Sequence, residues 1–154
     1  MQDKKPLIIL TGPTAVGKTE LSLQLAKAVN GEMISADSMQ VYRFMDIGTA
    51  KIMPEEMQGI RHHLIDVLDP TEDFNVVIFQ QMAKKAMEQI YAKGKIPIVV
   101  GGTGFYIQAL LYDTSFEETE ESIYRKELTK YYEQYGAHML HERLKAVSYT
   151  HLRA

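Results

Sequence analysis

Three short stretches of the chain are predominantly apolar and lie far apart in the sequence. They are residues 7–10, 32–36 and 96–100. Short runs of this kind are typical of strands that are buried on both faces of a parallel sheet. Pro97 stands near the start of the third run, where a strand tolerates proline. The pattern therefore predicts three strands in one sheet.

Helical periodicity fills the intervals between these strands. Residues 18–29 carry apolar side chains at four-residue spacing, and this predicts a helix that Gly31 ends as its left-handed C′ residue. A second helical pattern begins at a cap, either Asp73 or Asn75, and ends at Gly94. Both helices are long enough to cover a sheet.

The order of these elements predicts an α/β fold with a parallel sheet flanked by helices, completed by a third helix after residue 104. Residues 38–75 show little periodicity and contain several glycines and prolines. We expect loops with short helical pieces there. A loop region of this length in a compact domain is usually functional.

Beyond Asp113 the pattern changes to helices without strands. The acidic stretch 117–121 is typical of a helix start, and Gly136 separates a first helix from a second one over about 137–147. Tyrosines form a stripe along the first of these helices. We interpret the stripe as a packed helix face, and a base-stacking platform is the alternative.

The first predicted strand leads into a phosphate-binding motif. Its sequence is Gly12-Pro13-Thr14-Ala15-Val16-Gly17-Lys18-Thr19, which has the G-x-x-x-x-G-K-T spacing. The glycines let backbone N–H groups turn toward phosphate oxygens, and the following helix adds the positive end of its dipole. Lys18 supplies a cation, and the Thr19 hydroxyl is a ligand for Mg²⁺. The motif in its strand–loop–helix context predicts a P-loop NTPase-like sheet that binds a phosphate chain.

Asp37 is the carboxylate that we expect to face this loop, because it ends the second strand and strand ends meet at one edge of a parallel sheet. The third strand ends in Gly101-Gly102, without the acidic residue that hydrolytic ATPases use. An aspartate after a strand is also a common cap. Ser38 is placed to orient the carboxylate and Gln40 to bond a base edge, although both are also common turn residues.

Further polar groups follow in the loop region and at the third strand end. Arg43 and Lys51 are placed to reach a diphosphate, or they are solvated surface charges. Adjacent His62 and His63 point apart on any regular element, so packing and hydrogen bonding are more plausible for them than a metal site. The glycine-rich turn around Thr103 brings the backbone close to a ligand at the same edge.

Composition adds the charge balance of the chain and the expected cellular compartment. The chain has 154 residues, a formal net charge of −3 and no cysteine. It has no apolar run near the ~20 residues that span a membrane, and its first residues lack the features of a secretory signal, so we expect a cytoplasmic protein. The acidic balance is unusual for a protein that binds nucleic acid by itself.

Four collinear segments together carry a resemblance to one family. They are Gly12–Thr19, Asp37–Lys51, His62–Asp66 and Val100–Tyr106. Over about residues 5–147 the chain resembles the bacterial tRNA dimethylallyltransferases, also called tRNA isopentenyltransferases. The segment Asp37–Lys51 makes the resemblance specific, because ordinary kinases do not share it.

The resemblance implies transfer of a dimethylallyl group from dimethylallyl diphosphate to N6 of adenine 37, beside the anticodon of tRNA. It implies that the phosphate loop holds the donor's diphosphate, that Lys18, Thr19 and the cofactor Mg²⁺ stabilise the leaving pyrophosphate, and that Asp37 is the base. The implied tRNA contacts are Asp37, Ser38, Met39, Gln40, Thr103 and Arg125. We expect tRNA and dimethylallyl diphosphate as partners, no membrane, and a monomer at full length.

The resemblance also divides the chain. It implies an incomplete P-loop core over residues 1–113 and the truncated start of an inserted helical domain over 114–147. Residues 148–154 depart from the family pattern, in which an Asp-Pro pair is expected, and we interpret them as a foreign or frameshifted tail. Since members of the family are considerably longer, we expect this chain alone to be inactive in transfer.

Two other functions stay open at this point. A small-molecule or nucleotide kinase would use the same phosphate loop, but it would need an arginine-bearing lid that the sequence does not suggest. A module that binds a diphosphate without turnover would need only the loop.

Overall fold

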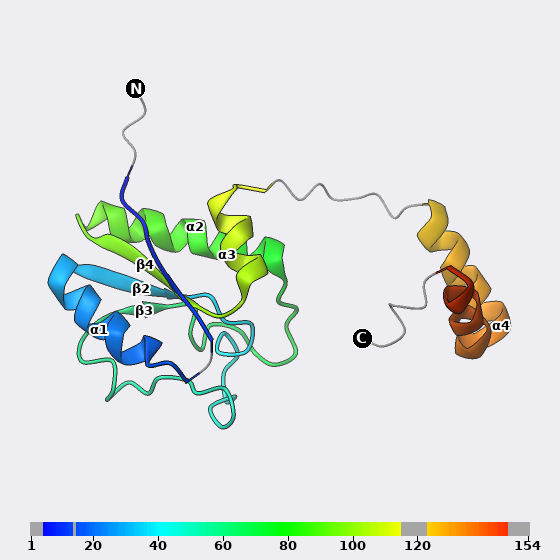
Figure 1. Cartoon of the computed structure of the whole chain (residues 1–154), viewed down its shortest axis with the longest axis horizontal. Helices are drawn as coiled ribbons and strands as arrows, with labels where there is room; N and C mark the ends of the chain where they lie inside the picture. The colour runs from blue at the N-terminus through cyan, green and yellow to red at the C-terminus, as the bar shows by residue number, and fades with distance from the viewer. Residues whose placement is uncertain (1–4, 14, 115–122, 148–154) are drawn as a thin grey trace. The chain divides into compact units, whose positions relative to one another are not determined.

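The computed structural model describes residues 5–13, 15–114 and 123–147. The chain divides into two compact units, Met1–Ser115 and Phe116–Ala154. The first unit contains a sheet and three helices, and the second contains helix α4 (Ile123–Val147) (Figure 1).

Four parallel strands form the sheet of the first unit, in the order β1-β4-β2-β3. They are β1 (Ile8–Thr11), β2 (Gly31–Ser35), β3 (His62–His63) and β4 (Ile96–Gly101). Val100 of β4 pairs with Leu10 of β1 on one side and with Ser35 of β2 on the other. The C-terminal ends of these three strands therefore lie side by side.

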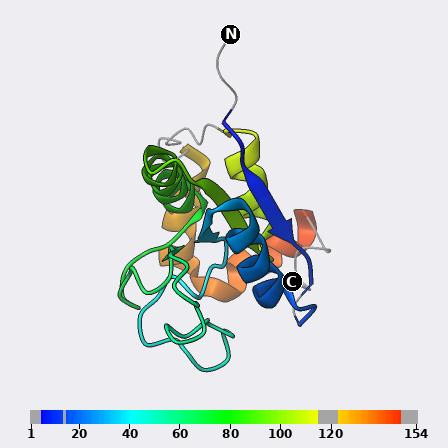
Figure 2. The same cartoon turned by 90° about the vertical axis from the view of Figure 1, so that its left-hand side faces the viewer.

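Helices cover both faces of the sheet (Figures 1 and 2). Helix α1 (Lys18–Val29) packs on one face, whereas α2 (Val76–Ala92) and α3 (Gly104–Leu111) pack together on the other. Side chains alternate along the strands, so Met33 and Ile98 contact the α1 layer while their neighbours Ile34 and Val99 contact the α2 and α3 layer. The α/β fold with a parallel sheet flanked by helices is thus confirmed.

Local capping chemistry sets the helix boundaries. Of the two predicted caps of α2, Asn75 holds the position, and its Oδ1 accepts hydrogen bonds from two N–H groups of the first turn at 3.0 Å each. The prediction for the end of α1 is wrong, because Asn30, with φ of 52°, takes the left-handed conformation expected of Gly31. Gly31 instead begins β2, where an added Cβ would come within 2.9 Å of a carbonyl oxygen of β4.

The long segment between β2 and α2 differs from the prediction. Residues 36–75 contain turns and strand β3 but no α-helix, so the expected helical pieces are absent from this range. The sequence did not predict β3, because its two residues carry no periodicity. The strand exists because His62 pairs with Met33 and His63 with Ile34. The remaining loops extend beside the sheet (cyan to green in Figure 2).

The second unit consists of two helical segments within α4. Gly136, with φ of 77° and ψ of 172°, separates them, as predicted. The interpretation of the tyrosine stripe as a packed face is wrong for Tyr124, Tyr132 and Tyr135, which are 76, 50 and 51% exposed. Tyr131 is less exposed, and the centroid of its ring lies 4.7 Å from that of Tyr135. The predicted acidic helix start at 117–121 lies outside the described residues.

None of the described helices combines the length and the apolar character that a crossing of the bilayer requires.

Candidate functional site

The phosphate-binding motif forms the turn between β1 and α1. Gly17 is the N-terminal cap of α1 and has a φ of 80°, a conformation that glycine adopts without strain. The turn aims the first N–H groups of α1 and the positive end of its dipole at one concave surface. Thr14 of the motif lies outside the described residues.

Lys18 and Thr19 begin α1, and both line a cavity at this edge of the sheet. The Lys18 ammonium donates hydrogen bonds to the Gly12 carbonyl oxygen at 2.8 Å and to that of Pro13. Because an ammonium has three N–H groups, one remains for a ligand once the described acceptors are counted. The Thr19 hydroxyl makes no hydrogen bond with a described residue, so its oxygen is available to a ligand.

Asp37 follows β2 and lines the same cavity. Its Oδ1 accepts hydrogen bonds from the Met39 N–H at 2.8 Å and the Gln40 N–H at 3.2 Å. These bonds close a turn and fix the plane of the carboxylate. Its other oxygen, Oδ2, accepts no hydrogen bond from the described part of the chain. Capping and proton transfer can therefore use different oxygens of one side chain.

Two glycines at the end of β4 explain how closely these groups approach. A Cβ added at Gly101 would overlap the Ala36 carbonyl oxygen, and one added at Gly102 would lie 3.8 Å from the Gly12 carbonyl oxygen. The end of β4 thus contacts both the start of the phosphate loop and the residue before Asp37. The bare backbone of Gly101 in particular allows this approach, which brings the loop and the carboxylate to one cavity.

The cavity has a volume of about 380 Å³ and a lining of mixed polarity. Lys18, Thr19 and Asp37 contribute charged and hydroxyl groups, and we call these three residues the polar end of the cavity. Apolar side chains also line it, among them Met33, Ile52, Ile65 and Val100, and so do the polar side chains of Gln40, Thr49 and His62. Sequence reasoning missed Ile52 and Ile65, because only the path of the long loop brings them here. The arrangement suits a small ligand with an anionic end and an apolar end.

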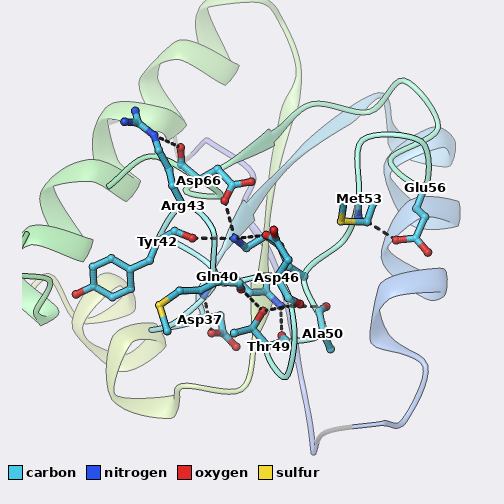
Figure 3. Close-up of polar contacts among 12 residues, drawn as sticks. Asp37, Gln40, Tyr42, Arg43, Asp46, Thr49, Ala50, Met53, Glu56 and Asp66 are labelled. Carbon is cyan, nitrogen blue, oxygen red and sulfur yellow. Dashed lines mark hydrogen bonds and ion pairs between the residues drawn. The ribbon is translucent and has the colours of Figure 1, made fainter. Parts of the chain in front are cut away.

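Gln40 connects the end of β2 to the long loop (Figure 3). Its Oε1 accepts a hydrogen bond from the Ser35 hydroxyl at 3.1 Å, and its Nε2 donates to the carbonyl oxygens of Thr49 at 3.1 Å and Ala50 at 3.3 Å. The amide therefore holds residues 49 and 50 at the cavity. Contact of this amide with a base edge stays a prediction, and it requires these bonds to exchange.

The other predicted tRNA contacts do not line the cavity. Ser38 makes no hydrogen bond to Asp37 within the described residues, so the backbone, and not Ser38, orients the carboxylate as shown above. Met39 is 42% exposed, and Thr103 precedes α3 without a side-chain capping bond. Arg125 belongs to α4 in the second unit. Their contacts with tRNA stay predictions.

The two loop cations have a different role from the predicted one. Neither Arg43 nor Lys51 lines the cavity. Arg43 donates to the Asp66 carbonyl oxygen and to Asp69 Oδ1, each at 3.2 Å. Lys51 is buried and bonds only to acceptors of the loop region. The expectation that they reach a diphosphate is therefore not met. Loop acceptors use all three N–H groups of the Lys51 ammonium, whereas Arg43 stays 48% exposed and fits the alternative of a solvated surface charge.

The adjacent histidines have separate environments. His62 lines the cavity, and burial lowers its pKa although its Nδ1 lies 2.9 Å from the Ile60 carbonyl oxygen. His63 is buried, with its Nε2 2.9 Å from Glu32 Oε2. Within the described ranges, no group of three His, Cys, Asp or Glu side chains is arranged to hold a metal ion.

The polar end of the cavity nevertheless fits Mg²⁺ bound together with a phosphate ligand. Mg²⁺ prefers oxygen ligands and is usually held by one or two protein groups, several waters and the substrate's phosphates. The uncommitted Thr19 hydroxyl is such a group, and it lies at the phosphate loop. The residues present therefore fit the ion through Thr19.

Comparison with known proteins places these features in a family. The model of the IPP transferase family matches residues 40–152. A tRNA dimethylallyltransferase of Lachnoclostridium phytofermentans is 63% identical over 142 residues, which cover 92% of this chain and 45% of that protein. The one from Bacillus subtilis is 51% identical over 144 residues, covering 93% and 46%. The chain spans about half the length of the curated relatives that it matches.

Solved structures show the same likeness. The full-length tRNA isopentenylpyrophosphate transferase of Bacillus halodurans superposes with a TM-score of 0.74 at 47% identity, covering 96% of this chain and 49% of that one. A eukaryotic dimethylallyltransferase acting on tRNA superposes with a TM-score of 0.71 at 37% identity, covering 82% and 36%. The family match extends into residues 148–154, which lie outside the described residues, so their interpretation as a foreign tail stays a prediction.

Proposed function

The chain belongs to the IPP transferase family, and we propose that it supplies the donor-binding and proton-accepting groups of a tRNA dimethylallyltransferase. That enzyme moves a dimethylallyl group from dimethylallyl diphosphate to N6 of adenine 37 of tRNA. The observation that carries the proposal is that the phosphate loop and Asp37 line one cavity. We assign the activity to a protein of the relatives' length, acting in the cytoplasm as a monomer.

The polar end of the cavity binds the diphosphate in this proposal. Backbone N–H groups at the start of α1 donate to its oxygens, and so does the third N–H group of the Lys18 ammonium. Thr19 would hold Mg²⁺, whose charge would offset the negative charge of the leaving pyrophosphate. Because these groups are fixed before the reaction, they stabilise the charge that develops on the leaving group.

The apolar part of the cavity receives the dimethylallyl group. Met33, Ile52 and Ile65 present hydrocarbon there, so the reactive carbon is held away from bulk water. Exclusion of water favours transfer to the amine over hydrolysis of the donor.

Asp37 acts as the general base. The adenine amine is a poor nucleophile, because its lone pair is delocalised into the ring. As the bond between N6 and the dimethylallyl carbon forms and the bond from that carbon to the diphosphate oxygen breaks, Asp37 Oδ2 takes the proton from N6. An adenine must leave its stack to reach this oxygen. In this proposal Ser38, Met39, Gln40, Thr103 and Arg125 contact the tRNA.

The donor site is tested by Lys18→Ala. We expect binding of dimethylallyl diphosphate, measured by calorimetry with Mg²⁺ present, to be lost in this variant. The matched control is Lys85→Ala, which removes an exposed lysine of α2 far along the chain from the loop. Unchanged affinity in Lys18→Ala would contradict the proposal, and so would rapid ATP hydrolysis by the unaltered protein.

A further inference from the structure

The long loop contains one fully buried ammonium group. The Lys51 side chain is 1% exposed, and its Nζ lies 2.7 Å from the Tyr42 carbonyl oxygen, 2.9 Å from Asp46 Oδ1 and 2.6 Å from Asp66 Oδ1. Figure 3 shows these three acceptors arranged around one point. All three N–H groups of the ammonium are thus used. Burial alone would lower the pKa of Lys51, but the hydrogen bonds to Asp66 and Asp46 raise it overall, so the group is charged at neutral pH.

The partners of Lys51 adjoin the residues that form one wall of the cavity. Ala50 and Ile52, which flank Lys51, both line the cavity, and so does Ile65, which precedes Asp66. The ion pair between Lys51 and Asp66 therefore joins the two chain segments that make this wall. These segments are 13 residues apart in the sequence, counted from Ile52 to Ile65.

The backbone of both segments needs such a constraint. Ala50, Leu64 and Asp66 have φ of 48°, 62° and 54°, in the left-handed region that side chains other than glycine rarely occupy. Residues persist in such conformations only where the surrounding structure determines them. Gln40 holds the Ala50 carbonyl from one side, and Lys51 holds the segments from the other.

We propose that Lys51 is a positioning residue for the hydrocarbon end of the donor: its ion pairs with Asp46 and Asp66 hold Ala50, Ile52 and Ile65 where the dimethylallyl group packs. The identity of the ligand rests on the proposed function. Without the ammonium, the carboxylates of Asp46 and Asp66 repel each other, and each is half-exposed, with 49% of its side chain accessible. The two segments then separate while the phosphate loop, whose described residues form no hydrogen bond or ion pair with the Lys51 side chain, is unchanged.

The proposal predicts a selective loss of affinity. Lys51→Met keeps an unbranched side chain that is one atom shorter, and it removes the donors. We expect binding of dimethylallyl diphosphate to weaken roughly tenfold, as a misfit of about one methylene does in an apolar pocket, while inorganic pyrophosphate binds as before. Lys84→Met is the matched control, because it removes an exposed ion pair with Asp113 outside the cavity. Equal loss for both ligands, or no loss for either, would overturn the proposal.

Amide hydrogen exchange provides a readout that needs no ligand, so it separates this proposal from the assignment of the donor. In Lys51→Met we expect faster exchange over residues 45–52 and 64–68, with residues 96–101 of β4 still protected. Asp66→Asn keeps an acceptor for Lys51, so we expect the same pattern at smaller amplitude. If Lys51→Met does not fold, the exchange pattern of Asp66→Asn tests whether this ion pair positions the cavity wall. Exchange that is uniform along the chain, or unchanged, would show that Lys51 does not position the wall.

Discussion

The two oxygens of Asp37 separate two roles that are usually alternatives for an aspartate after a strand. Oδ1 accepts two backbone hydrogen bonds and so keeps the turn closed. Oδ2 has no partner in the described part of the chain and is free to take a proton. A substitution that preserves the first role and removes the second can therefore distinguish them.

Asp37→Asn is that substitution. It keeps an oxygen for the turn but is not basic, so we expect kcat to fall by ~10²–10⁴-fold, the usual contribution of a positioned base, with little change in the KM for dimethylallyl diphosphate. The measurement is steady-state transfer to tRNA in a protein of the relatives' length that contains these residues. Melting temperature is taken on the same preparation. A normal kcat with a lowered melting temperature would leave Asp37 only a cap.

The positions of single residues were predictable from the sequence when local structure fixes them. The phosphate loop and Asp37 could be placed at one edge of the sheet, because a strand and a glycine-rich turn fix where their side chains lie. The roles of Gln40 and Lys51 could not, because their partners, such as Asp66, are brought near by loops without periodicity. The two cations were candidates for a phosphate contact or for surface charges. Lys51 is buried among loop acceptors, whereas Arg43 stays half-exposed.

At the scale of the elements, the contribution of the N-terminal cap of α2 to stability can be measured directly. Asn75 Oδ1 satisfies two N–H groups at the start of this helix. We expect Asn75→Ala to lower the free energy of unfolding by about 1 kcal/mol, the usual value of such a cap. Urea denaturation measures it.

Asp73→Ala is the matched control for this cap, because the sequence offered Asp73 as the alternative. It is exposed and makes no capping bond in the described structure. We expect its effect to be within the range of ordinary surface substitutions, about 0.5 kcal/mol or less. A larger loss from Asp73→Ala than from Asn75→Ala would mean that the helix begins elsewhere.

The elements themselves were predictable where periodicity was strong. The strands near residues 8, 32 and 96 and the three helices of the first unit follow the apolar pattern to within a residue or two. Strand β3 escaped prediction, because two residues have no period and its existence depends on β2. The tyrosine stripe of α4 was misread, because a periodic aromatic face indicates a helix but does not supply a partner that covers it.

For the whole molecule, one buried carboxylate connects distant segments. Glu32 is 3% exposed and accepts hydrogen bonds from Lys93 and Lys95, with His63 also in contact. Burial alone would raise the pKa of Glu32, but hydrogen bonds from His63, Lys93 and Lys95 lower it to about 2. The charge thus joins β2 to β3 and to the segment between α2 and β4.

This shift predicts how stability depends on pH. The pKa of Glu32 is lower in the folded state than its ordinary value near 4.5, so its contribution is complete above pH 4.5 and is lost as the pH falls toward 2. The difference corresponds to roughly 3 kcal/mol at about 1.4 kcal/mol per pKa unit. We expect Glu32→Gln to lower the free energy of unfolding at pH 7, and the gap to the unaltered protein to narrow below pH 4.5.

Urea denaturation between pH 7 and pH 3 measures this gap. Glu88→Gln, an exposed position of α2, is the control and should leave the curve of the unaltered protein nearly unchanged. A gap between Glu32→Gln and the unaltered protein that stays constant with pH would show that the Glu32 charge does not stabilise the fold.

The contact of Gly101 with the Ala36 backbone also bears on how this protein can change over evolutionary time. The spacing between the phosphate loop and Asp37 is set by main chain against main chain, not by interlocking side chains. Substitutions in the layers packed on either face of the sheet can therefore accumulate and alter stability while this main-chain contact is kept. Gly101 itself is the exception, because the smallest added side chain would push the end of β4 away from Ala36 and separate the two halves of the cavity.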